Sequence, residues 1–259
     1  MIDSHAHILA EQFDSDRDVL ITQAAEHALA WVEVGTDVAV SKKAVELADK
    51  HAHIFASVGV HPDDISNMSE DDWNTLELLA ENKKVCAIGE VGFDTYRDGT
   101  IEQQEPILRK FIALAQKANK PIIFHVRSGN GIDAHTELLR VLSSYPAHEL
   151  PRGVIHTFSG TLQQVQEYMA LGMMISFSGV VTFKNAQELR EIAKNIPIES
   201  MLVETDCPFL TPEPFRGKRN EPSYVRYVIA TIATLRGVSF EEIEQATQQN
   251  TKKLFALDM

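Results

Sequence analysis

The sequence predicts an α/β protein: a single (β/α)8 barrel that covers residues 1–259 and carries extra helices at its C-terminal end. Three observations lead to this fold. Eight short apolar runs alternate with longer stretches of helical period. The length of 259 residues matches such barrels, which run to about 250 residues. No break in composition and no long Pro/Gly/Ser linker divides the chain. An open, doubly wound sheet is the alternative fold.

The predicted strands are runs rich in Val, Ile and Phe, bounded by polar or turn-forming residues. Continuous apolar runs are typical of parallel strands that are buried on both faces. In chain order they cover residues 2–7, 30–34, 54–60, 85–88, 121–126, 153–156, 173–177 and 201–205.

The predicted helices lie between these strands, where apolar residues recur with the helical period. Two signals mark helix ends: Ser69 with Asp72 resembles a capping box, and Gly172 stands where a C-cap glycine is expected. The helices between strands cover residues 16–27, 42–51, 71–82, 102–117, 134–143, 162–171 and 186–195. Residues 222–235 and 240–254 add two amphipathic helices that complete the outer ring.

The charge balance excludes some classes of function. A net charge of −13 argues against a general electrostatic binder of nucleic acid or anionic membrane, although a local cationic site could still bind a phosphorylated substrate. Cys86 and Cys207 form no C-x-x-C motif, which suits a reducing compartment. No apolar stretch is long enough to cross a bilayer and no signal peptide is visible, so we expect a cytoplasmic protein without an obligate protein partner.

The first strand carries the motif IDSHAHI. Side chains alternate along a strand, so Asp3, His5 and His7 are expected on one face. Two imidazoles at positions i and i+2 form half of a metal site. A polar edge strand with solvated histidines is the alternative interpretation, because an isolated H-x-H is a weak motif.

Further polar residues stand at the ends of other predicted strands. The carboxyl ends of barrel strands meet at one mouth, where active sites lie. Burying these groups without partners is costly, and a shared cation would satisfy them together. The residues are His61 after the third strand, Glu90 after the fourth, His125 in the fifth, His156 in the sixth, and Glu204 and Asp206 in and after the eighth.

Each of these residues also has a structural interpretation. A core histidine is usually hydrogen-bonded and inert, Asp206 could cap a turn, and Glu90 could pair with Arg127. Coincidence at so many strand ends favours a metal centre. Cys207 is expected to pack in the core. The other histidines, His27, His51, His53, His135 and His148, are expected at the surface.

The number and type of candidate ligands predict two divalent ions. Four histidines with two carboxylates exceed the ligands of one tetrahedral zinc. We expect Glu90 to bridge the ions, with Asp206 as the general base. His5, His7 and Asp206 would hold one ion, and His125 and His156 the other. Imidazole ligands favour Zn²⁺ or another first-row ion such as Mn²⁺ over Mg²⁺.

The motifs DSHAH, GVHP, AIGEVGFD, IFHVRS, GVIHTFSG, LVETDCPFLTP, FRGKRNEP and NTKKLFAL together resemble the TatD family of metal-dependent deoxyribonucleases. They follow the family's order from residue 3 to residue 257. The resemblance implies a TIM barrel, two divalent ions and hydrolysis of phosphodiester bonds, often as a 3′ exonuclease. The ligands that it implies are His5, His7, Glu90, His125, His156 and Asp206.

Two positions depart from the family pattern and concern the choice of substrate. The family often has an aromatic pair where this chain has Thr95-Tyr96, and a serine where it has Val126 before Arg127. Cationic residues follow the eighth strand, where barrels often bind phosphate. The alternative for Arg219 is a structural pair with Glu221. Candidate substrate contacts are His61, Arg127, Glu204, Arg216, Lys218 and Arg219.

The sequence thus predicts a dinuclear metal hydrolase, with Asp206 and Glu90 as catalytic residues and the end of a DNA strand as substrate. One alternative is a hydrolase of a small phosphoester, lactone or amide on the same barrel, which the acidic charge and the lack of a basic or aromatic track favour. The other is a non-enzymatic metal-binding protein, in which saturated coordination would leave no open position for water.

Overall fold

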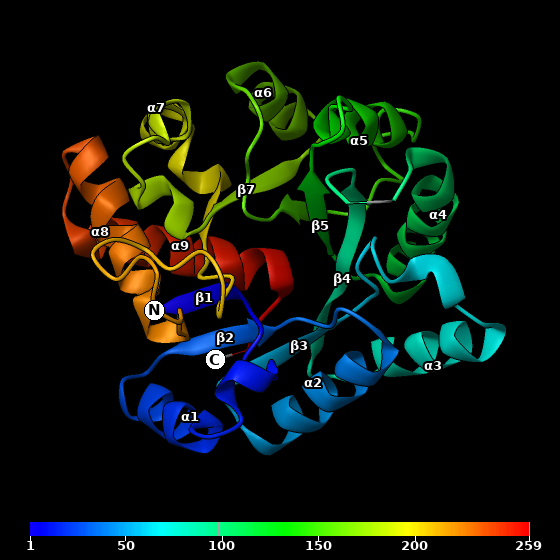
Figure 1. Cartoon of the computed structure of the whole chain (residues 1–259), viewed down its shortest axis with the longest axis horizontal. Helices are drawn as coiled ribbons and strands as arrows, with labels where there is room; N and C mark the ends of the chain where they lie inside the picture. The colour runs from blue at the N-terminus through cyan, green and yellow to red at the C-terminus, as the bar shows by residue number, and fades with distance from the viewer. Residues whose placement is uncertain (98, 259) are drawn as a thin grey trace.

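The computed structural model describes residues 1–97 and 99–258, and it contains eight parallel strands in a ring (Figure 1). Each strand pairs with the next along the chain, in the order β1 to β8. The predicted (β/α)8 barrel is therefore confirmed, and the open doubly wound sheet is excluded. The strands are β1 Ile2–Ala6, β2 Ala30–Glu33, β3 Ile54–Val58, β4 Val85–Asp94, β5 Ile122–Arg127, β6 Gly153–Ile155, β7 Met173–Phe177 and β8 Met201–Val203.

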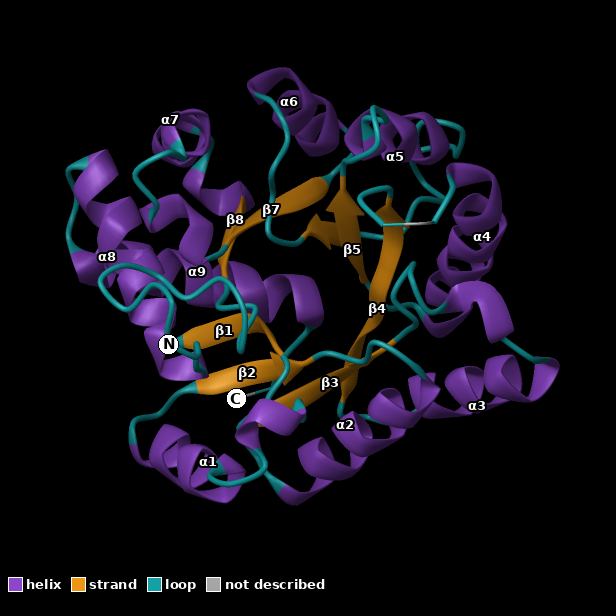
Figure 2. Cartoon of the chain, in the orientation of Figure 1, coloured by secondary structure: helices purple, strands orange, loops and turns teal. Residues whose placement is uncertain are grey.

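Helices surround the strands (Figure 2). Ser69 forms the predicted capping box with Asp72 at the start of α3, and Gly172 follows α6 with φ +79°. The α-helices are α1 Arg17–Glu26, α2 Val38–Lys50, α3 Glu70–Ala80, α4 Ile101–Ala118, α5 Ala134–Leu142, α6 Leu162–Ala170, α7 Gln187–Asn195, α8 Val225–Arg236 and α9 Phe240–Phe255. Short 3-10 helices span Glu11–Phe13, Ile65–Asn67, Gly179–Thr182, Ile198–Ser200 and Pro222–Tyr224. None of the described helices has the length and apolar character needed to cross a membrane.

The fourth strand is longer than predicted, since it continues past residue 88 to Asp94. Two glycines interrupt the apolar pattern there, and this ended the sequence-based strand too early. Gly92 pairs with His125 at a very close approach: a Cβ atom on Gly92 would lie 2.0 Å from the His125 carbonyl oxygen. Its φ of +151° is also a conformation that favours glycine. The extension places Glu90 and Asp94 inside a paired strand, where their backbone is held.

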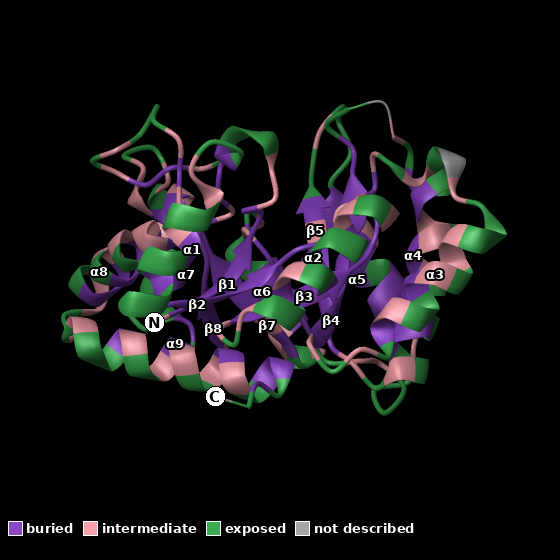
Figure 3. Ribbon diagram, turned by 90° about the horizontal axis from the view of Figure 1, so that it is seen from below, coloured by how far each residue is buried: buried purple, intermediate pink, exposed green. Residues whose placement is uncertain are grey.

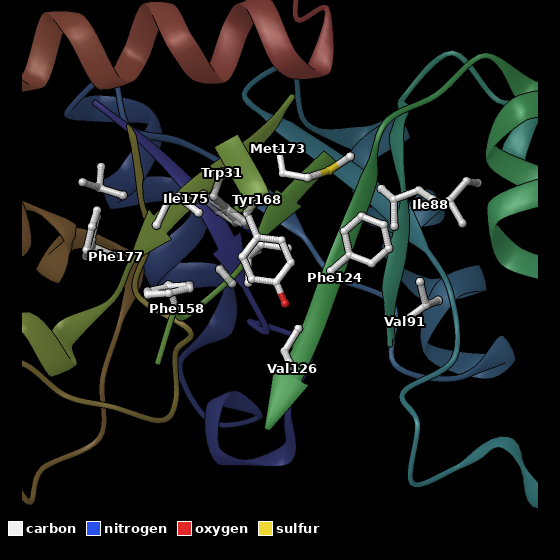
Figure 4. Close-up of a cluster of buried hydrophobic side chains, with 14 of the residues drawn as sticks. Trp31, Ile88, Val91, Phe124, Val126, Phe158, Tyr168, Met173, Ile175 and Phe177 are labelled. Carbon is white, nitrogen blue, oxygen red and sulfur yellow. The ribbon is translucent and has the colours of Figure 1, made fainter. Parts of the chain in front are cut away.

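Two apolar clusters pack the barrel. The larger one joins the outer faces of the strands to the helices and includes Trp31, Phe124 and Tyr168 (Figure 4). The smaller one joins residues from several strands to Leu254, Phe255 and Leu257 at the end of the chain. In Figure 3, α9 lies along the lower edge of the molecule beneath the buried strands. The C-terminal segment therefore covers the end of the barrel opposite the strand tips. The prediction that residues 240–254 complete the outer ring is wrong in this respect, because α9 lies across that end.

The ring closes between β1 and the segment that follows β8. The Asp206 N–H donates to the His5 carbonyl, and the His7 N–H donates to the Cys207 carbonyl, both at 2.9 Å. The fully buried Asp3 carboxylate adds to this seam, because it accepts from the backbone N–H of Thr205 at 2.8 Å and from its hydroxyl. Cys207 and Cys86 are both free and buried, so Cys207 packs as expected.

The prediction that Asp3 shares a face with the two histidines is wrong. The β1 register shifts between Asp3 and Ala6, so simple alternation does not hold through this strand. Asp3 turns to Thr205 and to the His5 N–H, which lies 3.2 Å from its carboxylate. Asp3 thus serves the seam and not the histidine cluster.

We expect Asp3→Ala to lower the free energy of unfolding by about 2–4 kcal/mol, because buried donors of Thr205 and His5 lose their acceptor. Urea unfolding followed by circular dichroism measures the change. Asp3→Asn keeps one acceptor oxygen and should lose less, and Asp258→Ala, at an exposed position, serves as the control. A wild-type midpoint for Asp3→Ala would show that the seam does not depend on this carboxylate.

Candidate metal centre

A cavity of about 670 Å³ opens at the carboxyl ends of the strands. Its wall includes five of the six predicted ligands, which are His7, Glu90, His125, His156 and Asp206. The sixth, His5, lies 1% exposed beneath His7 and Asp206. The strand-end positions predicted from the sequence thus come together in one place.

His5, His7 and Asp206 form the first group of potential ligands. His5 lies near the end of β1 and His7 follows this strand. The hydrogen bonds of the seam bring Asp206 beside both histidines. The Nε2 atoms of the two histidines lie 3.0 Å apart, and Asp206 Oδ1 lies 3.5 Å from His5 Nε2 and 3.3 Å from His7 Nε2. His7 Nδ1 faces the Val34 carbonyl at 3.3 Å, so this nitrogen carries the proton and Nε2 is free to bind a cation.

Glu90, His125 and His156 form the second group. Glu90 Oε2 lies 3.3 Å from His125 Nδ1 and 3.0 Å from His156 Nε2, and the two nitrogens are 3.1 Å apart. The three side chains come from β4, from β5 and from the residue that follows β6. Both predicted groups are present, and two more groups overlap them: His5 with His156 and Glu204, and His61 with Asp94 and His125.

The Glu90 carboxylate lies between the two groups. Its Oε1 is 3.6 Å from His7 Nε2, while its Oε2 is turned to His125 and His156. Burial opposes ionisation of Glu90, but the charge of His156 and the hydrogen bonds from His125 and His156 outweigh it and hold the pKa of Glu90 well below its usual range. Glu90 is thus an anion within reach of both groups, since Oε2 also lies 3.8 Å from His5 Nε2. The predicted pair with Arg127 does not form, because Glu90 is surrounded by histidines.

Two carboxylates on the far side of the histidine rings orient those rings. One of the two, Asp94, was not predicted from the sequence. Asp94 Oδ2 lies 3.1 Å from His125 Nε2, which turns Nδ1 of that ring to Glu90. Although burial raises it, the hydrogen bond with His125 brings the pKa of Asp94 to about 2. Glu204 Oε1 lies 3.4 Å from His156 Nδ1. The last residue of AIGEVGFD was the available signal for Asp94, but the predicted strand ended before it.

Glu33 on β2 is a second missed residue. It is fully buried, accepts hydrogen bonds from the backbone of Ile8 and Leu9 and from the Trp31 indole, and lines the cavity. Burial raises the pKa of Glu33 to about 7. A charged residue within an apolar strand was the signal. Its contacts tie the chain after His7 to β2, so Glu33 helps to hold the β1 end in place.

Two residues of the centre adopt left-handed backbone conformations. Thr157 has φ +42° and Asp206 has φ +55°. A β-branched residue rarely adopts this conformation, and such residues concentrate at functional sites. The Thr157 turn directs both its N–H and its hydroxyl to Glu204 Oε1, each at 2.6 Å. The strained turn therefore holds Glu204 behind His156.

The donor set fits a divalent cation. Imidazole nitrogens and carboxylate oxygens from five barrel strands and their ends converge, and each proposed group has its ligand atoms within 4.8 Å of one another. The His5 Nε2 and His7 Nε2 atoms face each other at 3.0 Å with Asp206 alongside, an arrangement that one shared cation would satisfy. Nitrogen and oxygen ligands of this type are those of Zn²⁺ and related first-row ions.

Among the predicted substrate residues, His61 and Arg127 line the cavity. The His61 ring lies 4.2 Å from that of His125, and burial lowers the pKa of His61 to about 3. The Arg127 guanidinium stacks on the Tyr96 ring at 3.9 Å. Within the described part of the chain, no carboxylate pairs with Arg127. Glu204 lies behind His156 and not on the cavity wall.

The basic loop after β8 lies apart from the cavity. Arg219 pairs with Asp16 at 2.6 and 2.8 Å, so the predicted partner Glu221 is wrong. Arg216 stacks on Phe183 and is exposed, and Lys218 is exposed as well. The loop is held by the fully buried Asn220, whose amide donates to the carbonyls of Thr205 and Phe209. None of these three cations is among the described residues of the cavity wall.

The prediction that the remaining histidines lie at the surface is only partly right. His27 and His148 are exposed as expected, but His51 and His53 are half-buried and His135 is 2% exposed. His135 lies on the inner face of α5, where it contacts Tyr168 and Ser159. The prediction that His135 is exposed is therefore wrong, because His135 lies on the apolar face of its helix.

Comparisons with known proteins agree with this geometry. The model of the family described as TatD related DNase matches residues 2–256. An uncharacterized metal-dependent hydrolase YabD of Bacillus subtilis is 42% identical, with 100% of both chains covered. A protein of Pantoea ananatis named 3'-5' ssDNA/RNA exonuclease TatD is 34% identical, over 99% of this chain and 100% of that relative.

Solved structures give the same result. The crystal structure of YJJV, a TatD homolog from Escherichia coli K12, superposes with a TM-score of 0.90 at 30% identity, covering 100% of this chain and 98% of that one. The matches span the barrel and all the strand ends that build the cavity. The chain belongs to the TatD family of metal-dependent hydrolases.

Proposed function

We propose that this protein is a dinuclear hydrolase that removes nucleotides from the 3′ end of a nucleic acid strand. The observation that carries the proposal is the Glu90 carboxylate, with one oxygen toward His7 and the other toward His125 and His156. A carboxylate in this position can bridge two cations about 3.5–4 Å apart. The relatives named as exonucleases support the choice of a nucleic acid substrate.

The ligand assignment follows the two groups of side chains. One cation would be held by His5, His7 and Asp206, and the other by His125 and His156, with Glu90 shared. Divalent ions in such a site polarise a phosphoryl group and acidify a water molecule. Zn²⁺ and Mn²⁺ suit this nitrogen-rich donor set better than Mg²⁺ does.

Asp206 is assigned as the general base. Its Oδ1 is turned to His5 and His7, so Oδ2 is the atom that accepts the proton from the attacking water. The carboxylate lines the cavity, and the seam hydrogen bond to the His5 carbonyl holds its backbone. Asp94 keeps the His125 ring in its binding orientation throughout the reaction.

Arg127 is assigned to a phosphate of the substrate. Its guanidinium lies flat on the Tyr96 ring, and stacking leaves the N–H groups at the edge of the guanidinium available to phosphate oxygens. Tyr96 is itself 58% exposed, and the Asn130 amide supports the backbone on either side of it by donating to the carbonyls of Thr95 and Arg97 at 2.8 Å. Arg216 and Lys218 are exposed and remain assigned to phosphates further along the strand.

A smaller ester is the second candidate substrate. Asp63 and Asp64 line the cavity beside the candidate centre and would repel a long polyanion. A cytoplasmic location is part of either proposal. The two candidates differ in how the reaction depends on substrate length and on salt.

We expect close to two divalent ions per chain after metal reconstitution. Glu90→Gln removes the shared anion and should lower the occupancy of both sites, measured by mass spectrometry of the metals. Glu191→Gln, at an exposed helix position, serves as the control. A ratio that saturates near one ion per chain in the wild type would refute the dinuclear assignment.

Asp206→Asn should fold and retain some metal but lose hydrolytic activity by about 100-fold or more, because the amide cannot accept the proton. The comparison is kcat on a one-phosphate chromogenic diester. Turnover near the wild-type value would move the base to another residue, and Glu204 or His61 would be tested next.

Arg127→Gln should raise KM for a single-stranded oligonucleotide by about 10-fold, since a charged hydrogen bond to phosphate is lost. The slope of log KM against log salt should fall by about 0.7, as expected for one phosphate contact on a single strand. Arg152→Gln, at the opposite end of the barrel before β6, should leave both values unchanged.

The same variants separate the two candidate substrates. For an oligonucleotide enzyme, Arg127→Gln affects the oligonucleotide more than the chromogenic diester. An equal loss on both would favour the small ester. No loss on either would remove Arg127 from the substrate site.

A further inference from the structure

An aromatic side chain that the proposed reaction does not use lies beside the candidate metal centre. Phe209 is 55% exposed and lines the cavity. Of the large hydrophobic side chains that are exposed in residues 1–97 and 99–258, it is the one that reaches the cavity wall. Single exposed apolar residues are common on protein surfaces, but one on the wall of a cavity of this size is in position to contact a ligand.

The Phe209 ring has no stacking partner among the described residues, since neither an aromatic ring nor a cation packs on it. Other partly exposed aromatic rings of this region are already covered. The Arg127 guanidinium lies 3.9 Å from the Tyr96 ring centroid. On the loop after β8, Phe215 is stacked on Tyr224 with centroids 4.8 Å apart. The exposed face of Phe209 is therefore available to a planar ligand.

The backbone on both sides of Phe209 is supported. Its N–H donates to the Asp206 carbonyl at 3.0 Å, and its carbonyl accepts from the amide of the fully buried Asn220 at 2.6 Å. Leu210, the next residue, has a left-handed backbone with φ +52°, and a Cβ atom on Gly179 would lie 1.9 Å from its carbonyl oxygen. The turn that carries the proposed general base thus also carries the aromatic ring.

The cavity has an apolar side and a charged side. The strands β8, β1 and β2 lie across the ring from β4 and β5 (Figure 2). The apolar wall residues that are not buried all follow β1, β2 or β8, and they are Leu9, Ala10, Val40, Phe209 and Leu210. Outside the proposed ligand groups, the charged wall residues with exposed surface belong to β5 or follow β3 or β4, and they are Asp63, Asp64, Arg97 and Arg127.

A nucleotide has the same division, because one sugar joins its anionic phosphate to a flat base. We propose that Phe209 stacks on the base of the nucleotide whose phosphate lies at the candidate metal centre. The inference rests on the proposed hydrolysis of a nucleic acid and adds the subsite for the base. Stacking tolerates different sequences, because every base has a π-face. Phe209 thus selects nucleotides over sugar phosphates without selecting a sequence.

A stacking contact suits an acidic protein that acts on a polyanion. The chain has a net charge of −13, and Asp63 and Asp64 on the cavity wall oppose the approach of phosphates. The face of a neutral base is not subject to this repulsion. Binding through the base therefore supplies affinity for the end of a strand without an extended basic surface.

Two ligands that differ only in the base test the inference: thymidine 5′-monophosphate and 2-deoxyribose 5-phosphate. Their dissociation constants are measured by calorimetry on protein loaded with Mn²⁺. We expect the wild type to bind the nucleotide about 10-fold more tightly, as is typical of one stacked base. Phe209→Ala should lose this preference and bind the sugar phosphate with the wild-type constant.

Further variants separate stacking from a simple apolar contact. Phe209→Tyr keeps the ring and should keep the preference, whereas Phe209→Leu keeps an apolar side chain without the ring and should lose most of it. Leu78→Ala, at a 69% exposed position of α3 that does not line the cavity, is the matched control and should bind both ligands as the wild type does. Circular dichroism and metal content must be equal among the variants that are compared.

Three results would overturn the inference: a wild type that binds both ligands equally or binds neither, an unchanged preference in Phe209→Ala, or equal preferences in Phe209→Leu and Phe209→Tyr. Hydrolysis of a single-stranded oligonucleotide by the same wild-type preparation tests the proposed function separately. Hydrolysis without a preference for the nucleotide would reject the role of Phe209 and leave the proposed hydrolase standing. A preference that depends on Phe209, without hydrolysis of the oligonucleotide, would keep the base subsite and reject the exonuclease.

Discussion

The free-energy cost of burying charged and polar groups at the mouth of an apolar barrel is the constraint on which the rest of this structure depends. Glu90 is 4% exposed and His5 is 1% exposed, so neither is solvated as it would be in water. Most of the groups that compensate them come from other strands: Asp206 and Glu90 face His5, and His125 and His156 face Glu90. The fold therefore has to bring distant strand ends within a few ångströms of one another, and a parallel barrel does this because all its strands end at the same rim.

The orientation of these groups depends on partners that stand behind them. The Val34 carbonyl sets the tautomer of His7, Asp94 turns His125, and Glu204 faces His156. The left-handed backbone at Thr157 stores strain that its two hydrogen bonds to Glu204 compensate. A centre built in this way is preorganised, since little rearrangement is needed when a ligand binds.

Local pattern predicted the barrel and the strand-end residues, because each apolar run and its terminal polar residue are contiguous in sequence. Features that depend on distant or irregular backbone were not predictable. The register shift in β1 turned Asp3 away from the histidines. Arg219 pairs with Asp16, 203 residues away, and not with its neighbour Glu221. The glycines of β4 made the predicted strand end before Asp94. The burial of His135 depends on how α5 packs in the folded protein.

The seam between β1 and the segment after β8 also determines when the centre can form during synthesis. Asp3 and Thr205 are 202 residues apart, so this contact waits until most of the chain has left the ribosome. Glu90, His125 and His156 emerge earlier, but His5 and His7 lack Asp206 until the eighth strand is made. Chains that stop before this point cannot assemble the first ligand group. Completion of the barrel and completion of the His5, His7 and Asp206 group are therefore one event, so an unfinished chain lacks this group of potential ligands.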